Sequence, residues 1–153
     1  MSLIASYQHR LVDGLLERRL RHHAAILLVG PRATGKTTSA ARLARSFIRL
    51  DQRGQAIAAT ADPDAALRGL AEPVLIDEWQ IVPEILGAVK RAVDTDPRPG
   101  RFIVTGSVRG DVASPTWPGT GRLLQIAMYG MTVGEIRGTP LGTPFLDRLA
   151  ESG

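Results

Sequence analysis

The stretch AAILLVGPRATGKTT, residues 24–38, decides how the rest of the chain is interpreted. Its apolar run from Ala24 to Val29 is typical of a strand covered by helices on both faces. The residues after it fit the phosphate-loop pattern G-x-x-x-x-G-K-S/T, which carries meaning only between a strand and a helix. A helical pattern does follow, from Thr37 to Phe47. The fixed positions of the pattern are filled by Gly30, Gly35, Lys36 and Thr37. The sequence therefore predicts a strand, a phosphate loop and a helix in direct succession.

The chemistry of such a loop follows from the charge of its ligand. A triphosphate carries several negative charges, so the loop uses glycines to allow close approach and aims successive backbone N–H groups inward. The following helix adds its positive N-terminal end. Lys36 is placed to reach the β- and γ-phosphates in a catalytic role, and the Thr37 hydroxyl to bind Mg²⁺. The residues expected around the nucleotide are Gly30, Pro31, Arg32, Ala33, Thr34, Gly35, Lys36, Thr37 and Thr38.

A second strand ends in two acidic residues. In VLIDEWQ, residues 74–80, an apolar run delivers Asp77 to a point where it would position Mg²⁺. The adjacent Glu78 would orient or deprotonate the attacking water. An isolated acidic pair is more often a helix cap or a solvated turn, but its place directly after a buried strand favours the metal and water roles. Trp79 is interpreted as a packing residue rather than as a contact to a base.

Two further candidates follow the later strands. The strand from Arg101 to Thr105 leads into Ser107, and a polar side chain there would reach the γ-phosphate or its attacking water; an ordinary strand-to-turn transition is the equal alternative. Arg122 stands just before the last strand. An arginine that approaches the γ-phosphate of its own or a neighbouring subunit would stabilise charge in the transition state.

The remaining pattern alternates helices and strands. Helices are expected over residues 7–21, after Asp62 with Pro63 at the first helical position, and from Pro83 onward. Strands are expected over residues 47–50 and 123–128, and residues 108–121 are expected to form a surface loop. The alternation predicts an α/β fold with a mainly parallel sheet and helices on both faces.

Composition limits the classes of protein that fit. A chain of 153 residues, 44% hydrophobic and 22% charged, suits one folded domain. The absence of cysteine excludes disulfides, thiolate metal sites and cysteine nucleophiles. The net charge of +4 comes mainly from 17 scattered arginines, which favours solvated side chains over a nucleic-acid surface, and no motif supports nucleic acid. The longest apolar run is too short to cross a membrane and the first residues do not resemble a signal peptide, so a cytoplasmic location is expected.

The order of these motifs resembles a known family. Over residues 7–137, the chain is similar to the AAA-type N-terminal domain of a widespread family of prokaryotic predicted ATPases. The similarity lies in the leading helix and, in order, in LLVGPRATGKTT, LIDEWQIVPEIL, FIVTGS and GTGRLLQIAMYGMTVGE. The resemblance implies a three-layer P-loop fold with an AAA+-like five-stranded sheet in the order 5-1-4-3-2. It implies ATP as the nucleotide, Ser107 or Thr105 as the residue that senses the γ-phosphate, and Arg122 as the finger or sensor arginine.

The resemblance also bears on domain organisation. Members of that family usually continue into a C-terminal domain of unknown function, so residues 1–137 are expected to be the ATPase domain and residues 138–153 the start of a missing C-terminal region. The ring or dimer typical of AAA+ proteins is left open by the sequence.

The leading hypothesis is Mg²⁺-dependent ATP hydrolysis. The alternative is a nucleotide-gated interaction switch that binds ATP with little turnover because the C-terminal domain is absent. A small-molecule kinase also uses a phosphate loop, but Glu78 beside Asp77 argues against it, since a kinase gains nothing from activating water. A nucleic-acid motor would require stimulation by DNA or RNA.

Overall fold

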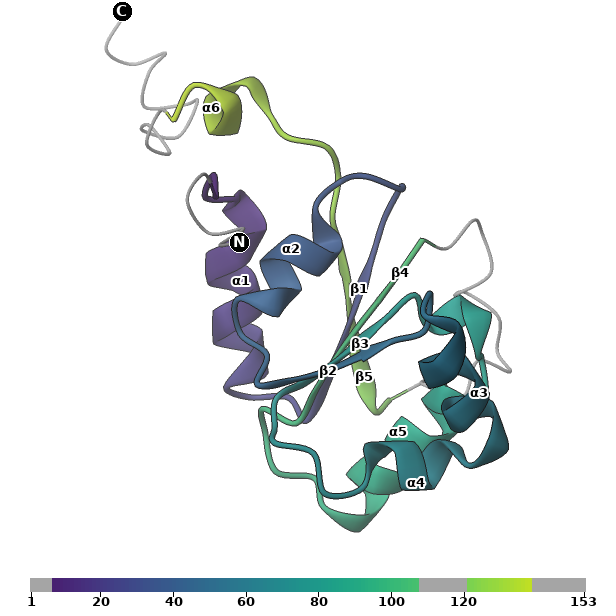
Figure 1. Ribbon diagram of the computed structural model, residues 1–153. Helices are drawn as coiled ribbons and strands as arrows, with labels where there is room; N and C mark the ends of the chain where they lie inside the picture. The colour runs from purple at the N-terminus through teal and green to yellow at the C-terminus, as the bar shows by residue number, and fades with distance from the viewer. Residues whose placement is uncertain (1–6, 108–120, 139–153) are drawn as a thin grey trace, which may run out of the picture.

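The computed structural model describes residues 7–107 and 121–138, which form a sheet between two layers of helices (Figure 1). All neighbouring strands are parallel, and their order is β2-β3-β4-β1-β5. This is the order that the family resemblance implied, given from the other edge, so the predicted fold class is confirmed. The strands are β1 (Ala25–Val29), β2 (Ser46–Arg49), β3 (Val74–Asp77), β4 (Phe102–Gly106) and β5 (Leu123–Ala127).

Helices cover both faces of the sheet. In Figure 1, α1 and α2 lie on one face, whereas α3, α4 and α5 lie on the other. The sixth helix, α6, is a single short turn after β5. The bounds are α1 (Leu11–Leu20), α2 (Lys36–Ala41), α3 (Arg53–Ala61), α4 (Pro63–Leu67), the 3₁₀ helix η1 (Trp79–Ile81), α5 (Ile85–Thr95) and α6 (Val133–Ile136).

The central strand β1 explains why two cores form. Its residues are all buried, and they alternate between the faces: Leu27 packs in the core under α3, α4 and α5, whereas Ile26 and Leu28 pack with α1 and α2. A strand of this kind needs apolar side chains on both faces. The apolar run of residues 24–29, which predicted a strand covered on both faces, does contain such a strand.

The strand register brings the carboxyl ends of the strands to one edge of the sheet. Val29, the last residue of β1, pairs with Gly106 of β4 and with Ala127 of β5. Asp77, the last residue of β3, pairs with Thr105. In a parallel sheet this edge is where the connecting loops place ligand-binding groups. We call it the carboxyl edge, and the opposite one the amino edge.

Two predicted helices are shorter than expected. The helix expected to reach Phe47 ends at Ala41, because the chain turns back into the sheet and the N–H of Arg45 donates to the carbonyl of Pro73, next to β3. The first helix begins at Leu11 rather than at residue 7, since the Asp13 carboxylate accepts from the N–H of Arg10 and caps the helix there.

Of the other local predictions, one is confirmed and one lies almost wholly outside the described residues, and one helix was not predicted. The helix predicted after Asp62 is confirmed as α4: Pro63 lies in its first turn, and the Asp62 carboxylate caps it, 2.9 Å from the N–H of Ala65. The helix α3 was not predicted, because it is short, rich in alanine and buries only Ala59. The surface loop predicted for residues 108–121 lies almost wholly outside the described residues. Among the described helices, none has the length and apolar character needed to cross a membrane.

Candidate phosphate-binding site

The loop between β1 and α2 is held at its first and last glycines. A side-chain Cβ on Gly30 would lie only 1.9 Å from the carbonyl oxygen of Met128, so the loop begins in close contact with the backbone after β5. Gly35 has φ of 87°, a left-handed conformation that glycine adopts without strain, and Lys36 begins α2 directly after it. Gly30 is thus required by the close approach of the backbone after β5, and Gly35 by its left-handed backbone conformation.

Lys36 folds over the loop from which it comes. Its ammonium group donates hydrogen bonds to the carbonyl oxygens of Gly30, at 2.9 Å, and Pro31, at 2.5 Å. Only 6% of the residue is exposed. Burial lowers the pKa of Lys36, while the nearby carboxylates of Glu78 and Asp77 act in the opposite direction. A positive charge therefore lies within the loop at the N-terminus of α2.

Asp77 and Thr37, far apart in the sequence, meet at the carboxyl edge. The Thr37 hydroxyl donates to Asp77 Oδ1 at 2.8 Å, and the Thr105 hydroxyl donates to the same oxygen at 2.5 Å. Asp77 is 5% exposed and Thr105 is fully buried. Because a buried carboxylate is costly unless it is hydrogen-bonded, Thr105 is part of the support for Asp77.

The oxygens of Thr37 and Asp77 are chemically suited to Mg²⁺. This cation takes oxygen ligands and usually binds through one or two protein groups together with phosphates and water. Within the described residues, no group of three or more His, Cys, Asp or Glu side chains is placed to hold a metal ion by itself. A cation at Thr37 and Asp77 would thus depend on phosphate oxygens for further ligands.

Glu78 and Ser107 are linked by a residue that the sequence reasoning missed. The side-chain amide of Gln80 donates to Glu78 Oε2 and, at 3.3 Å, to Ser107 Oγ. Glu78 itself has φ of 61°. The same segment lies so close to β4 that a Cβ on Gly106 would be 2.5 Å from Trp79 Cδ1. Trp79 packs against the core, which confirms its predicted role in packing.

Arg122 does not lie at this site. It directly precedes β5, whose first residue Leu123 pairs with the first residue of β1, so Arg122 belongs to the amino edge. Five strand residues separate it from the loop, which corresponds to roughly 15 Å or more. Its guanidinium binds the Asp94 carboxylate at 2.8 Å. The expectation that it approaches the phosphate site of its own chain is therefore wrong; a role in a neighbouring copy stays a prediction.

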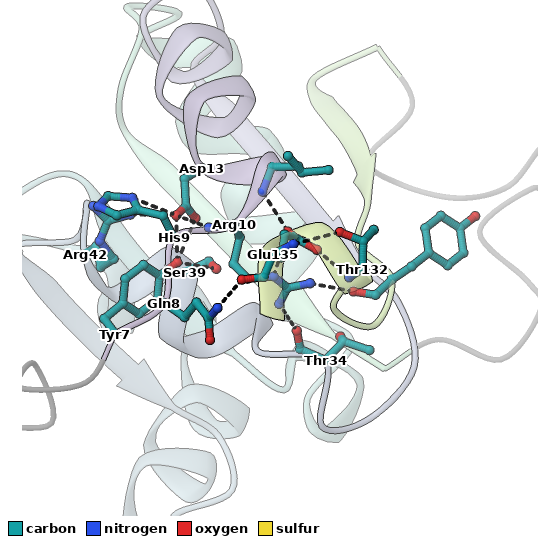
Figure 2. A network of polar contacts seen from close by, with 12 residues as sticks. Tyr7, Gln8, His9, Arg10, Asp13, Thr34, Ser39, Arg42, Thr132 and Glu135 are labelled. Carbon is teal, nitrogen blue, oxygen red and sulfur yellow. Dashed lines mark hydrogen bonds and ion pairs between the residues drawn. The ribbon is translucent and has the colours of Figure 1, made fainter. Parts of the chain in front are cut away.

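A second polar network, which the sequence reasoning did not assign, joins the start of α1 to α2 and α6 and contacts the loop at Thr34 (Figure 2). Arg10 contacts Glu135 and the Thr34 carbonyl, while Tyr7 and Arg42 contact Asp13. The T-x-x-E pattern of Thr132 to Glu135 was the available signal, because a threonine followed three residues later by glutamate forms a helix-capping box.

These features define the class of the protein. A phosphate loop between the central strand and a helix, with a serine or threonine hydroxyl bonded to an acid at the end of a neighbouring strand, is the arrangement of a P-loop nucleoside-triphosphatase domain. The sheet order β2-β3-β4-β1-β5 is the order expected of the AAA type.

Comparison with known proteins gives the family. A family model described as "AAA domain" matches residues 22–137, and the chain belongs to this family. It is an AAA-type ATPase domain.

Relatives extend well beyond this chain. An uncharacterized protein of Mycobacterium tuberculosis and one of Mycobacterium bovis are each 33% identical to it over 138 residues, which cover 88% of this chain and 30% of each relative. The chain thus spans under a third of these relatives. Among solved structures, a variant of RuvB from Thermotoga maritima is 26% identical with a TM-score of 0.46, covering 84% of this chain and 45% of that one.

Proposed function

We propose that this domain binds ATP together with Mg²⁺ and hydrolyses the terminal phosphoanhydride bond. The observation that carries the proposal is the meeting of the buried Lys36 ammonium, the Thr37 hydroxyl and the Asp77 carboxylate at one edge of the sheet. Buried polar groups are costly to a fold. A purely structural turn has no need of a buried ammonium beside a buried acid.

Each residue has a role in this proposal. The backbone N–H groups of residues 32–38 would surround the phosphates, and Lys36 would exchange its bonds to the carbonyls of Gly30 and Pro31 for bonds to phosphate oxygens. Thr37 and Asp77 would hold the cation. When bound, Mg²⁺ neutralises charge that develops on the phosphate oxygens.

The remaining residues act on water and on the γ-phosphate. Glu78 accepts a proton from the attacking water or orients it. Ser107, which shares the Gln80 amide with Glu78, would hydrogen-bond a γ-phosphate oxygen. Thr105 is less suited to contact nucleotide because it is fully buried and already donates to Asp77.

Nucleotide titration tests the proposal directly. Binding of ATP and GTP is measured with and without Mg²⁺ on the wild type, on Lys36→Ala and on Lys90→Ala, the other lysine of the chain, which lies on α5. We expect Mg²⁺-dependent ATP binding that is lost in Lys36→Ala and retained in Lys90→Ala. Wild-type protein that binds no nucleotide at millimolar concentration would overturn the proposed function.

One observation favours a second candidate, a nucleotide-gated switch with little turnover. Gln80 holds the Glu78 carboxylate through a hydrogen bond, so the proposed base is already engaged. If the domain is such a switch, it should bind ATP as tightly as an active ATPase does but release no inorganic phosphate. Measuring binding and release on the same preparation separates the two functions.

A further inference from the structure

Arg10 connects three separate parts of the molecule. Its Nη1 donates to the carbonyl of Thr34 in the phosphate loop at 2.6 Å, and its Nη2 donates to the carbonyl of Tyr129 at 2.9 Å. Its Nε donates to Glu135 Oε1 of α6 at 3.0 Å. Figure 2 shows the guanidinium of Arg10 between Glu135 and Thr34. One planar group thus joins the start of α1, the loop and the segment after β5.

The guanidinium is held firmly by its partner. Only 8% of the Arg10 side chain and 5% of the Glu135 side chain are exposed. Glu135 Oε1 also accepts from the N–H of Leu11 at 2.7 Å, while Oε2 accepts from the N–H of Thr132 at 2.7 Å. A carboxylate with donors on both oxygens has a defined orientation, and it fixes the arginine that it binds.

The contact at Thr34 has a direct consequence for the loop. A trans peptide unit is planar, so the carbonyl of Thr34 and the N–H of Gly35 point in opposite directions. Arg10 binds that carbonyl and so directs the Gly35 N–H away from itself. Because Gly35 has a left-handed backbone and no side chain, its peptide planes are free to rotate unless a neighbour restrains them.

A second contact ties the loop to the same segment. Gly30, the first residue of the loop, lies against the carbonyl of Met128, whose N–H donates to the carbonyl of Val29 at 2.7 Å. The segment from Met128 to Glu135 therefore touches the loop at its beginning directly and near its end through Arg10. Any movement of that segment changes both ends of the loop.

We propose that Arg10 is a positioning residue that orients the Thr34–Gly35 peptide for phosphate binding, and that through Glu135 it couples nucleotide binding to the segment from Met128 to Ile136. This inference rests on the proposed function, since it concerns the same loop. Because coupling between two sites is reciprocal, nucleotide bound in the loop must in turn stabilise this segment.

The control is a second arginine–carboxylate pair in the same network. Arg42 binds Asp13 at 3.0 Å and lies over the Tyr7 ring, but none of its described polar contacts involves the loop. Arg42→Ala removes an ion pair of the same length from the junction of α1 and α2, with its arginine 33% rather than 8% exposed. If Arg10 only helped to hold the helices together, Arg10→Ala and Arg42→Ala would affect ATP binding equally.

The first experiment measures the dissociation constant for ATP with Mg²⁺ in the wild type and in both variants, each confirmed as folded by its thermal transition. We expect Arg10→Ala to weaken binding about 10-fold, the scale of losing a hydrogen bond from a charged group, and Arg42→Ala to change it less than about twofold. Equal affinities of the two variants would overturn the inference while leaving the proposed function intact. Absence of binding in the wild type would instead overturn the proposed function.

Hydrogen exchange on the wild type tests the coupling without any variant. On adding ATP and Mg²⁺ we expect slower exchange in residues 30–38 and also in residues 129–136. Glu135→Gln should keep the first effect and reduce the second. Protection confined to residues 30–38 in the wild type would contradict the coupling, whether or not Arg10→Ala folds.

Discussion

The buried polar groups at the carboxyl edge of the sheet differ from the exposed ion pair of Arg122 at the amino edge. At the carboxyl edge Lys36, Asp77 and Thr105 are buried, and the Asp77 carboxylate is shared by two hydroxyl groups. At the amino edge, Arg122 and Asp94 form an exposed pair, with side chains 42% and 44% exposed, whereas Arg101 and Glu72 form a mostly buried one, with side chains 12% and 18% exposed. Both edges carry opposite charges close together, but the Arg122–Asp94 pair stays in water, whereas Lys36 and Asp77 are removed from it.

This difference indicates where function lies. An exposed ion pair contributes about 0–1 kcal/mol to stability and is readily replaced. A buried polar cluster loses the hydration of every group in it, so each group must be hydrogen-bonded, and removing one partner leaves the others unsatisfied. Substitutions at the carboxyl edge should therefore have large and specific effects, while substitution of an exposed pair such as Arg122 and Asp94 should have a small one.

The largest effect is expected at Glu78. Glu78→Gln preserves shape but removes the base, so phosphate release should fall at least about 100-fold, within the range typical of general-base catalysis, while ATP affinity changes little. Release of inorganic phosphate and nucleotide binding are measured on the same protein. The control is Glu84→Gln, an exposed glutamate before α5, which should behave as the wild type. Unchanged release in Glu78→Gln would remove Glu78 from the catalytic residues.

A stability effect of similar size is expected at the start of the loop. Gly30→Ala would place a methyl group against the Met128 carbonyl, at 1.9 Å before any relaxation, so the free energy of unfolding should fall by about 1–3 kcal/mol. Gly54→Ala in α3 meets no atom within 4 Å and should be neutral or slightly stabilising. Urea denaturation of both variants makes the comparison, and equal stabilities would show that the loop and the β5 segment do not need close contact.

A smaller, pH-dependent effect is expected at Glu135. Burial raises its pKa, but the hydrogen bonds from the Thr132 and Leu11 N–H groups and from Arg10 outweigh burial and lower the pKa from 4.5 to about 2. Because the folded pKa lies below the unfolded one, the stabilisation is fully present above pH 4.5 and is lost as the pH falls from there to about 2.

Glu135→Gln should therefore destabilise the domain at pH 7 by about 1–2 kcal/mol, since it weakens hydrogen bonds to a charged group, and flatten the decline of stability below pH 4.5. Urea midpoints recorded from pH 7 to pH 3 test this. A variant whose acid profile parallels that of the wild type would show that Glu135 does not contribute to the acid sensitivity.

The smallest effect is expected at Arg122. Arg122→Ala removes an exposed pair, so the free energy of unfolding should change by less than about 0.5 kcal/mol and ATP affinity should stay the same. Phosphate release measured over a range of protein concentrations tests the proposal that Arg122 serves a neighbouring copy. The role in a neighbouring copy is supported if Arg122→Ala releases less phosphate than the wild type at the concentrations at which the wild type self-associates. It is excluded if the variant releases phosphate as fast as the wild type at every concentration.

Sequence patterns were sufficient to predict the central strand, the phosphate loop and the meeting of Thr37 with Asp77. The apolar run of residues 24–29 requires cover on both faces, and the glycines and lysine after it have few uses other than a phosphate loop. The meeting of Thr37 with Asp77 was also predictable, because residues at the carboxyl ends of parallel strands lie along one edge. For these features, sequence spacing and strand direction together were sufficient.

Other features were decided only by tertiary structure. The place of Arg122 follows from the direction of β5: because β5 runs parallel to β1, a residue directly before it lies at the amino edge, away from the loop. The contact of Arg10 with Glu135 joins residues 125 positions apart, and the contact of Gln80 with Ser107 joins residues 27 positions apart. A sequence pattern records which groups are near along the chain. Burial, by contrast, depends on which distant segments pack together and exclude water. The packing of such segments brings the polar groups around this loop into one connected network.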